Sequence, residues 1–306
     1  MVASRLIEIV EVGPRDGLQG EPGVLPTATK IEFIERAIAT GVRRVEVASF
    51  VDPKRVPQMA DAEAVLAGLP RRPGVRYIGL VLNRRGFERA ARAGCDEIGM
   101  AVVASDTFNR RNQGVTTDES IAAWRDMAAA ARHEGILSQV TVSAAFGCPF
   151  EGEVPLQRVV DIARRVAEAE PFEIALADTI GAGVPAQVIE LIGRVREAVP
   201  GVALRCHFHN TRNTGLANAF AAVQSGVTTL DASLGGIGGC PFAPAATGNI
   251  PTEDLLYMLQ RSGYETGVSL AVAISTARWL QEQLGRPVPG MLVKAGDFTS
   301  PPARVS

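Results

Sequence analysis

The sequence predicts an α/β protein with the fold of a (β/α)8 TIM barrel. Eight apolar, strand-like segments recur along the chain, and segments with helical periodicity separate them. A doubly wound sheet would use fewer strands and would place a glycine fingerprint after the first one, and VGPRDGLQG at 12–20 is not that fingerprint. Strand count, alternation and length therefore favour the barrel.

The predicted strands are rich in β-branched and aromatic residues. In order they span 6–13, 43–50, 75–82, 95–104, 137–146, 171–179, 203–210 and 228–236. The clearest helical segments are 29–41, 118–135, 155–170, 185–199 and 213–226. A glycine- and proline-rich loop at 235–249 follows the eighth strand, and extra helices are expected near 252–263 and 269–284. We expect a single domain over 1–300 and a flexible tail at 301–306.

Composition excludes several classes of protein. The 306 residues are 46% hydrophobic and 21% charged, as in folded globular proteins. A formal net charge of −2, with Lys and Arg spread along the chain, argues against a nucleic-acid partner. No apolar run reaches the roughly 18 residues of a membrane span, and the amino terminus lacks the regions of a signal peptide, so we expect a cytoplasmic protein with no membrane partner.

Two histidines stand one residue apart in RCHFHN at 205–210. Successive strand residues face opposite sides, so His207 and His209 share a face with Arg205. The pair is either two hydrogen-bonded interior groups or part of a metal site. Strand ends carry the chemistry of such barrels, and Asp16 after the first strand can supply an anionic oxygen, which favours the metal. Nitrogen and oxygen ligands suit Mg2+ or Mn2+, with Co2+ and Zn2+ as alternatives.

The face that Arg205 shares with the histidines predicts that its guanidinium is buried. An unpaired buried guanidinium is costly, so a carboxylate partner is expected, with Glu173 on the preceding strand as the candidate. The third histidine, His133, lies near the end of a predicted helix and is expected at the surface.

The four cysteines lack Cys-x-x-Cys spacing and are expected to be free thiols. Cys206 and Cys95 should be inert and buried, whereas Cys148 is ambiguous. Cys240 differs because its glycine-rich loop gives it no packing role.

Six sequence blocks resemble 3-hydroxy-3-methylglutaryl-CoA lyase, a member of the DRE-TIM metallolyases. The blocks are EVGPRDGLQGE at 11–21, EVASFVDPKRVPQM at 46–59, GCPFEG at 147–152, ADTIG at 177–181, HFHNTRNTGLANA at 207–219 and GGIGGCPFAPAATGN at 235–249. They follow one another over nearly the whole chain. The cysteine-loop block separates the lyases from related condensing enzymes.

The resemblance implies a role for each matching residue. Asp16, His207, His209 and Asn249 fall at the positions of the metal ligands. Among the catalytic positions, Arg15 matches the Arg that steadies the enolate, Glu46 an active-site carboxylate, Cys240 the loop cysteine and Asp178 a further acid near the site.

The implied reaction is a metal-dependent retro-Claisen cleavage of a 3-hydroxyacyl-CoA that gives acetyl-CoA and a keto acid, acetoacetate in the case of hydroxymethylglutaryl-CoA. The alternatives are a sibling lyase for citramalyl-CoA or a longer branched thioester and, less favoured, a condensing acyltransferase of the isopropylmalate synthase type. The expected partner is the acyl-CoA substrate, and the expected assembly is a homo-oligomer, a dimer or tetramer.

The sequence departs from the family pattern at residues expected to bind substrate. Gln139 and Thr141 stand where the lyases commonly carry Arg and Tyr, and Ala175 stands where Ser is common. Asn210 replaces an Asp and Arg212 a Tyr. We therefore expect recognition of the acyl group either to shift to Arg212 or to accept a different acyl group.

Overall fold

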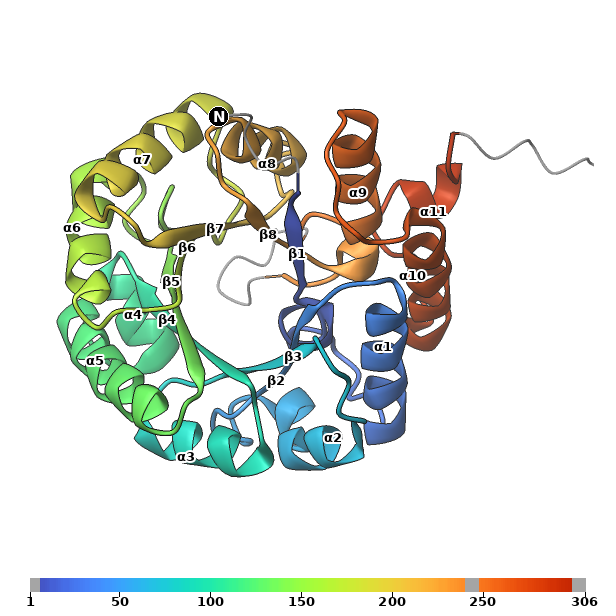
Figure 1. The fold of residues 1–306 in the computed structure, drawn as a ribbon, viewed down its shortest axis with the longest axis horizontal. Coiled ribbons are helices and arrows are strands. Elements are labelled where there is room, and N and C mark those ends of the chain that lie inside the picture. Colours follow the sequence, from blue (N-terminus) through green and yellow to red (C-terminus); the bar gives the residue numbers. More distant parts are fainter. Residues whose placement is uncertain (1–5, 240–247, 299–306) are drawn as a thin grey trace, which may run out of the picture.

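The computed structural model describes residues 6–239 and 248–298. Its eight parallel strands close into a barrel in which each strand pairs with its neighbours in sequence and β1 pairs with β8. Figure 1 shows this ring with helices outside it. The strands are β1 (Glu8–Glu11), β2 (Arg44–Ser49), β3 (Arg76–Leu80), β4 (Glu97–Val103), β5 (Leu137–Ser143), β6 (Glu173–Asp178), β7 (Ala203–Phe208) and β8 (Thr229–Ala232). The predicted fold is confirmed.

Helices connect the strands and cover the outside of the barrel. They are α1 (Thr27–Ala39), α2 (Ala62–Gly68), α3 (Arg84–Ala93), α4 (Asp106–Gln113), α5 (Thr117–His133), α6 (Leu156–Ala167), α7 (Pro185–Ala198) and α8 (Gly215–Gln224). After β8 follow α9 (Thr252–Arg261), α10 (Leu270–Leu284) and α11 (Leu292–Ala295), which confirm the expected C-terminal helices. These three stand together at one side of the ring, with α10 packed against α1 (Figure 1).

Local sequence sets the helix ends. In α5, the Thr116 hydroxyl accepts from the amide of Glu119, whose carboxylate accepts from the amide of Thr116, so both ends of a capping box are satisfied. Gly94 and Gly114 end α3 and α4 in the left-handed conformation. Because all eight strands are parallel, the loops that follow them lie together at one end of the barrel.

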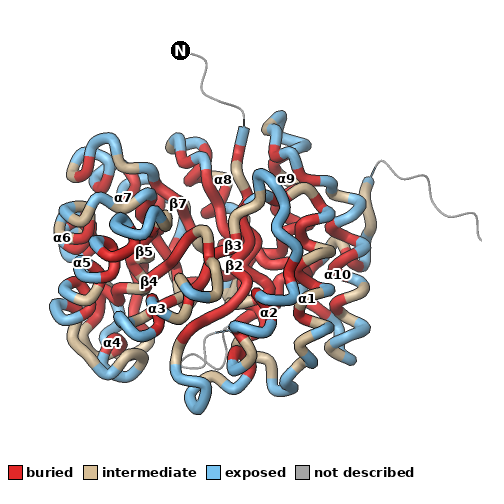
Figure 2. The backbone as a smooth tube through the Cα atoms, turned by 60° about the horizontal axis from the view of Figure 1, so that its bottom comes forward, coloured by how far each residue is buried: buried red, intermediate tan, exposed pale blue. Residues whose placement is uncertain are grey.

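The main apolar core lies between the strands and the surrounding helices. Trp124 of α5 is fully buried, and its indole N–H donates to the carbonyl of Val166 at 2.9 Å. Figure 2 shows the strands as the buried centre and the outer helix faces as the exposed surface. Among the described residues, no helix is both long and apolar enough to cross a membrane.

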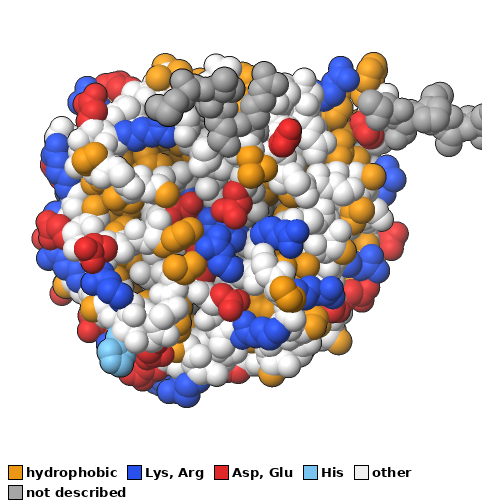
Figure 3. Space-filling model, in the orientation of Figure 1, with side chains coloured by type: hydrophobic (Ala, Val, Ile, Leu, Met, Phe, Trp, Pro, Cys, Tyr) orange, Lys and Arg blue, Asp and Glu red, His pale blue; other side chains and the backbone are white. Residues whose placement is uncertain are grey.

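Charged side chains fill the amino-terminal end of the barrel. Arg44 has no exposed surface, and its guanidinium pairs with Glu97 and, at 3.0 Å each, with Glu8 and Glu173. Figure 3 views this end, where acidic and basic side chains gather near the middle of the face. Because Arg44, Glu97 and Glu173 are buried away from water, they depend on one another to balance their charges.

Substituting Arg44→Met should lower the free energy of unfolding by about 3–5 kcal/mol, because it leaves buried carboxylates without their cation. Urea denaturation measures the change. The matched control is Arg194→Met, since Arg194 pairs with Glu190 at the surface and should cost about 1 kcal/mol or less. Equal losses in the two variants would contradict this account of the barrel end.

Candidate active site

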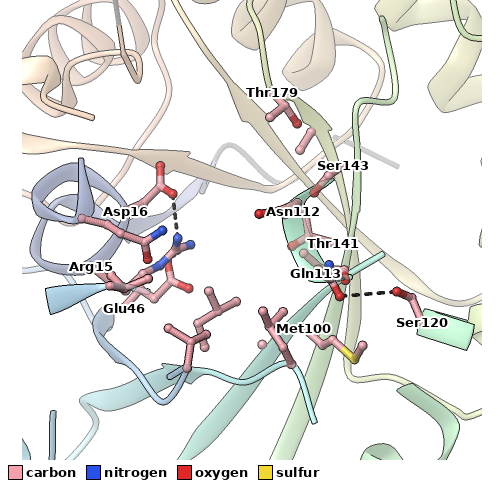
Figure 4. Close-up of a pocket in the computed structure, with 18 of the residues that line it drawn as sticks. Arg15, Asp16, Glu46, Met100, Asn112, Gln113, Ser120, Thr141, Ser143 and Thr179 are labelled. Carbon is pink, nitrogen blue, oxygen red and sulfur yellow. Dashed lines mark hydrogen bonds and ion pairs between the residues drawn. The ribbon is translucent and has the colours of Figure 1, made fainter. Parts of the chain in front are cut away.

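A cavity of about 610 Å3 opens at the carboxyl ends of the strands. In Figure 4, Arg15, Asp16 and Glu46 lie together on one side of it and face Thr141 and Ser143 across the cavity. The predicted site residues that line it are Arg15, Asp16, Glu46, Gln139, Thr141, His207 and His209. The structure thus brings together residues from four separate strands or strand ends.

Three of these residues form a cluster with the geometry of a metal site. One ligand atom from each of Asp16, His207 and His209 lies within 4.8 Å of the other two. Asp16 Oδ2 is 4.0 Å from His207 Nε2, and the two imidazole rings are 5.2 Å apart between centroids. A single cation between these atoms would contact two nitrogen donors and one anionic oxygen.

Asn249, the fourth expected ligand, also lies at this cluster. Its Nδ2 donates to Asp16 Oδ2 at 2.9 Å and to the carbonyl of Ile237 at 3.1 Å. Its Oδ1 and the Nδ1 of His209 are buried and have no hydrogen-bond partner among the described residues. Buried polar atoms are rarely left unpaired, so a divalent cation fits this donor set.

Asp231 of β8 orients His207. Its Oδ2 lies 3.1 Å from His207 Nδ1, which leaves Nε2 directed towards Asp16. Burial lowers the pKa of His207, but the hydrogen bond and charge of Asp231 outweigh this and raise it. Sequence reasoning missed Asp231, although an acid on the inward face of the last strand, beside a His-x-His strand, is a usable signal.

Arg15 joins the metal cluster to Glu46. Its Nη1 lies 2.7 Å from Asp16 Oδ1 and its Nη2 lies 2.7 Å from Glu46 Oε2. Burial would raise the pKa of Asp16, but the charges of Arg15 and the two histidines hold it well below its usual range. Burial raises the pKa of Glu46 despite the nearby Arg15. Asp16 is therefore ionised, as a metal ligand must be.

The turn that carries Arg15 and Asp16 requires small residues. A Cβ on Gly17 would come within 2.7 Å of the Ile237 side chain, and one on Gly238 within 3.0 Å of the Cα of Gly17. The segments after β1 and β8 therefore pack backbone against backbone, which places Asp16 beside Asn249.

The floor of the cavity contains Gln139 and Arg205. Arg205 Nη2 donates to Gln139 Oε1 at 2.5 Å, and its Nε lies 3.3 Å from Asp231 and 3.5 Å from Glu173. The predicted burial of Arg205 and its pairing with Glu173 are confirmed. The side chains of Gln139, Glu173 and Asp231 therefore already pair with the Arg205 guanidinium.

Apart from Asn249, which lies at the metal cluster, three described residues predicted for the site do not line the cavity. Strand alternation turns Thr179 into the cavity and Asp178 away from it, and Asp178 accepts hydrogen bonds from the amides of Ala182 and Gly183. Arg212 donates to the carbonyls of Ile180 and Gly181 instead of entering the cavity. The third is Ala175, which is buried within β6.

The remaining sequence predictions concern the histidine and cysteines outside the cluster. His133 ends α5 at the surface as expected. Cys206 and Cys95 are buried, and burial raises the pKa of both thiols. Cys148 is also buried, and its Sγ lies 2.9 Å from the Ser105 hydroxyl. Cys240 and the tail at 301–306 lie outside the described residues.

Asn210 stands where the family commonly has Asp, and its side chain makes a hydrogen bond within the same segment. Its Oδ1 accepts from the amide of Gly215 at 3.1 Å, at the start of α8.

Several known lyases are similar to this chain. A sequence model described as HMGL-like matches residues 6–279. The chain is 46% identical over 300 residues to (R)-citramalyl-CoA lyase of Chloroflexus aurantiacus, covering 95% of each protein. It is 41% identical over 283 residues to hydroxymethylglutaryl-CoA lyase YngG of Bacillus subtilis, covering 92% of this chain and 95% of that protein.

A solved structure shares the whole architecture. The HMG-CoA lyase of Acinetobacter baumannii, in complex with coenzyme A and 3-methylmalate, superposes with a TM-score of 0.94 at 39% identity, covering 98% of this chain and 99% of that one.

His207→Ala and Asp16→Asn should each lose bound Mn2+ while the protein stays folded, because these side chains lie at the mouth of the barrel and not in its apolar core. Metal content after desalting and the thermal unfolding midpoint measure the two properties. His133→Ala, a surface histidine, is the control and should retain wild-type metal. Full metal content in both site variants would show that the cation binds elsewhere.

Proposed function

The chain belongs to the HMGL-like family, and on this basis we propose that it is a metal-dependent carbon–carbon lyase for a 3-hydroxyacyl-CoA thioester. The products are acetyl-CoA and a keto acid. The observation that carries the proposal is the cluster of Asp16, His207 and His209 beside Arg15 in one cavity. Relatives of 41–46% identity are named as lyases of this kind.

The chemistry accounts for the residues present. Cleavage removes the proton of the C3 hydroxyl, breaks the C2–C3 bond and leaves its electron pair on the thioester fragment as an enolate. A divalent cation held by Asp16, His207, His209 and Asn249 would act as a Lewis acid that lowers the hydroxyl pKa and polarises the carbonyl that forms.

Arg15 is suited to the developing negative charge. Its guanidinium is fixed between Asp16 and Glu46, so it needs no rearrangement when the enolate forms. A preorganised donor of this kind contributes on the order of 3 kcal/mol to transition-state stabilisation. A proton must then reach C2 to give acetyl-CoA, and the family resemblance assigns this step to Cys240.

A condensing acyltransferase is the weaker candidate because the similar proteins named above are lyases. The cytoplasmic location and the homo-oligomeric state that the sequence suggests stay predictions.

The substrate choice follows from the floor of the cavity. A distal carboxylate such as that of hydroxymethylglutaryl-CoA needs a free cation, but Arg205 is already held by Glu173, Asp231 and Gln139. Citramalyl-CoA carries its carboxylate on the carbinol carbon, where the catalytic cation itself can bind it. The 46% identity to a citramalyl-CoA lyase supports this second candidate.

We expect hydroxymethylglutaryl-CoA to be cleaved with a lower kcat/KM than at least one related thioester, and citramalyl-CoA is the first to test. Acetyl-CoA release is measured with each thioester, with Mn2+ and after removal of the metal by a chelator. Activity should disappear with the chelator and return with Mn2+.

The control for this panel is Arg212→Ala, which should change little because Arg212 lies outside the cavity. If hydroxymethylglutaryl-CoA is clearly the best substrate, the departures at Gln139, Thr141 and Ala175 are neutral. Undiminished cleavage without metal would overturn the proposed mechanism.

Cys240→Ser should lower kcat by about 100-fold or more, within the range of a lost general acid, and leave Mn2+ content near that of the wild type. Single-turnover cleavage and metal analysis separate the two effects. Cys206→Ser is the matched control, because that buried thiol faces away from the cavity. A normal cleavage rate after selective alkylation of Cys240 would assign the proton to another group.

A further inference from the structure

Glu11 lies outside the cavity, yet it contacts the segments that carry the oxygen ligands. It is the last residue of β1 and has no exposed surface. Val10 and Val12 pack with Ile78 in a separate apolar cluster, so strand alternation directs Glu11 to the opposite side, towards α9. Among the described residues, no ion pair involves this carboxylate.

Three donors from three different segments converge on Glu11. Oε1 accepts from the amide of Gly13 at 2.8 Å and from the amide of Leu234 at 2.9 Å. Oε2 accepts from the hydroxyl of Thr252 at 2.6 Å. The two backbone amides can only donate, so they require the acceptor that Oε1 supplies, and the Thr252 hydroxyl donates to Oε2.

Each of these segments leads directly to the metal cluster. Gly13 opens the turn that carries Asp16. Leu234 opens the segment containing Ile237, whose carbonyl accepts from Asn249 Nδ2 at 3.1 Å. Thr252 follows Asn249 by three residues at the start of α9.

We propose that Glu11 is a positioning residue for the metal site. By joining the three segments it fixes Asp16 beside Asn249, whose mutual hydrogen bond is 2.9 Å long. The inference rests on the proposed metal-dependent function but concerns a residue that contacts neither the metal cluster nor the cavity. Burial without a neighbouring cation raises the pKa of Glu11 to about 7. An ionised carboxylate at this position therefore costs free energy of folding.

Gly13 provides a second, independent probe of the same contact. A Cβ at this position would meet Glu11 Oε1 at 2.5 Å, so alanine must displace the carboxylate. Gly23 is the matched control, because a Cβ there meets no atom within 4 Å. Neither glycine has a positive φ that would strain alanine.

The test measures the Kd of Mn2+ by titration of the folded apoprotein, together with its thermal unfolding midpoint. Glu11→Ala removes both acceptor oxygens and leaves the amides of Gly13 and Leu234 without their partner. We expect Glu11→Ala and Gly13→Ala each to weaken Mn2+ binding by about tenfold, as loss of an outer partner of a metal site does. Gly23→Ala should retain the wild-type Kd.

A purely structural role would lower the unfolding midpoint of the apoprotein and leave the Kd of Mn2+ unchanged. That result in either Glu11→Ala or Gly13→Ala overturns the inference, and Gly13→Ala supplies the measurement if Glu11→Ala does not fold. Failure of the wild-type protein to bind Mn2+ would instead refute the metal site itself.

Discussion

The structure depends on the pairing of charges inside the barrel. Arg44 at the amino-terminal end and Arg205 in the middle share Glu173, and Arg205 also lies 3.3 Å from Asp231. Asp231 in turn orients His207 at the carboxyl end. Buried charges are tolerated only when paired, so the side chains of one level fix those of the next. The position of His207 therefore depends on a series of contacts that begins with Arg44 at the amino-terminal end of the barrel.

The charge balance of this interior favours a divalent cation. Within the described residues, the connected ion pairs involve six carboxylates and four guanidinium groups. This excess of carboxylates favours a cation at Asp16, His207 and His209. The carboxylates are Glu8, Asp16, Glu46, Glu97, Glu173 and Asp231, and the guanidinium groups belong to Arg15, Arg44, Arg76 and Arg205.

Local patterns were sufficient to predict the barrel and the inward face of β7. The alternation that places His207 and Arg205 on one face is a property of any strand, so it could be read without coordinates. Glu11 could not be found in this way, because its partners Leu234 and Thr252 are more than two hundred residues away in sequence. The family resemblance assigned Asp178 to the site. In the structure, however, the next residue, Thr179, lines the cavity, and Asp178 accepts a hydrogen bond from the amide of Ala182.

The same reasoning explains why residue types alone give a poor account of substrate choice. Gln139 replaces a common Arg, which suggests a lost cation, yet Arg205 places another guanidinium against Gln139. That group does not substitute for the lost one, because Glu173 and Asp231 already balance its charge. The cation available to a substrate carboxylate would then be a metal ion held by Asp16, His207 and His209. A carboxylate on the carbinol carbon could bind such an ion together with the hydroxyl, whereas a carboxylate one methylene further along the chain would lie further from it.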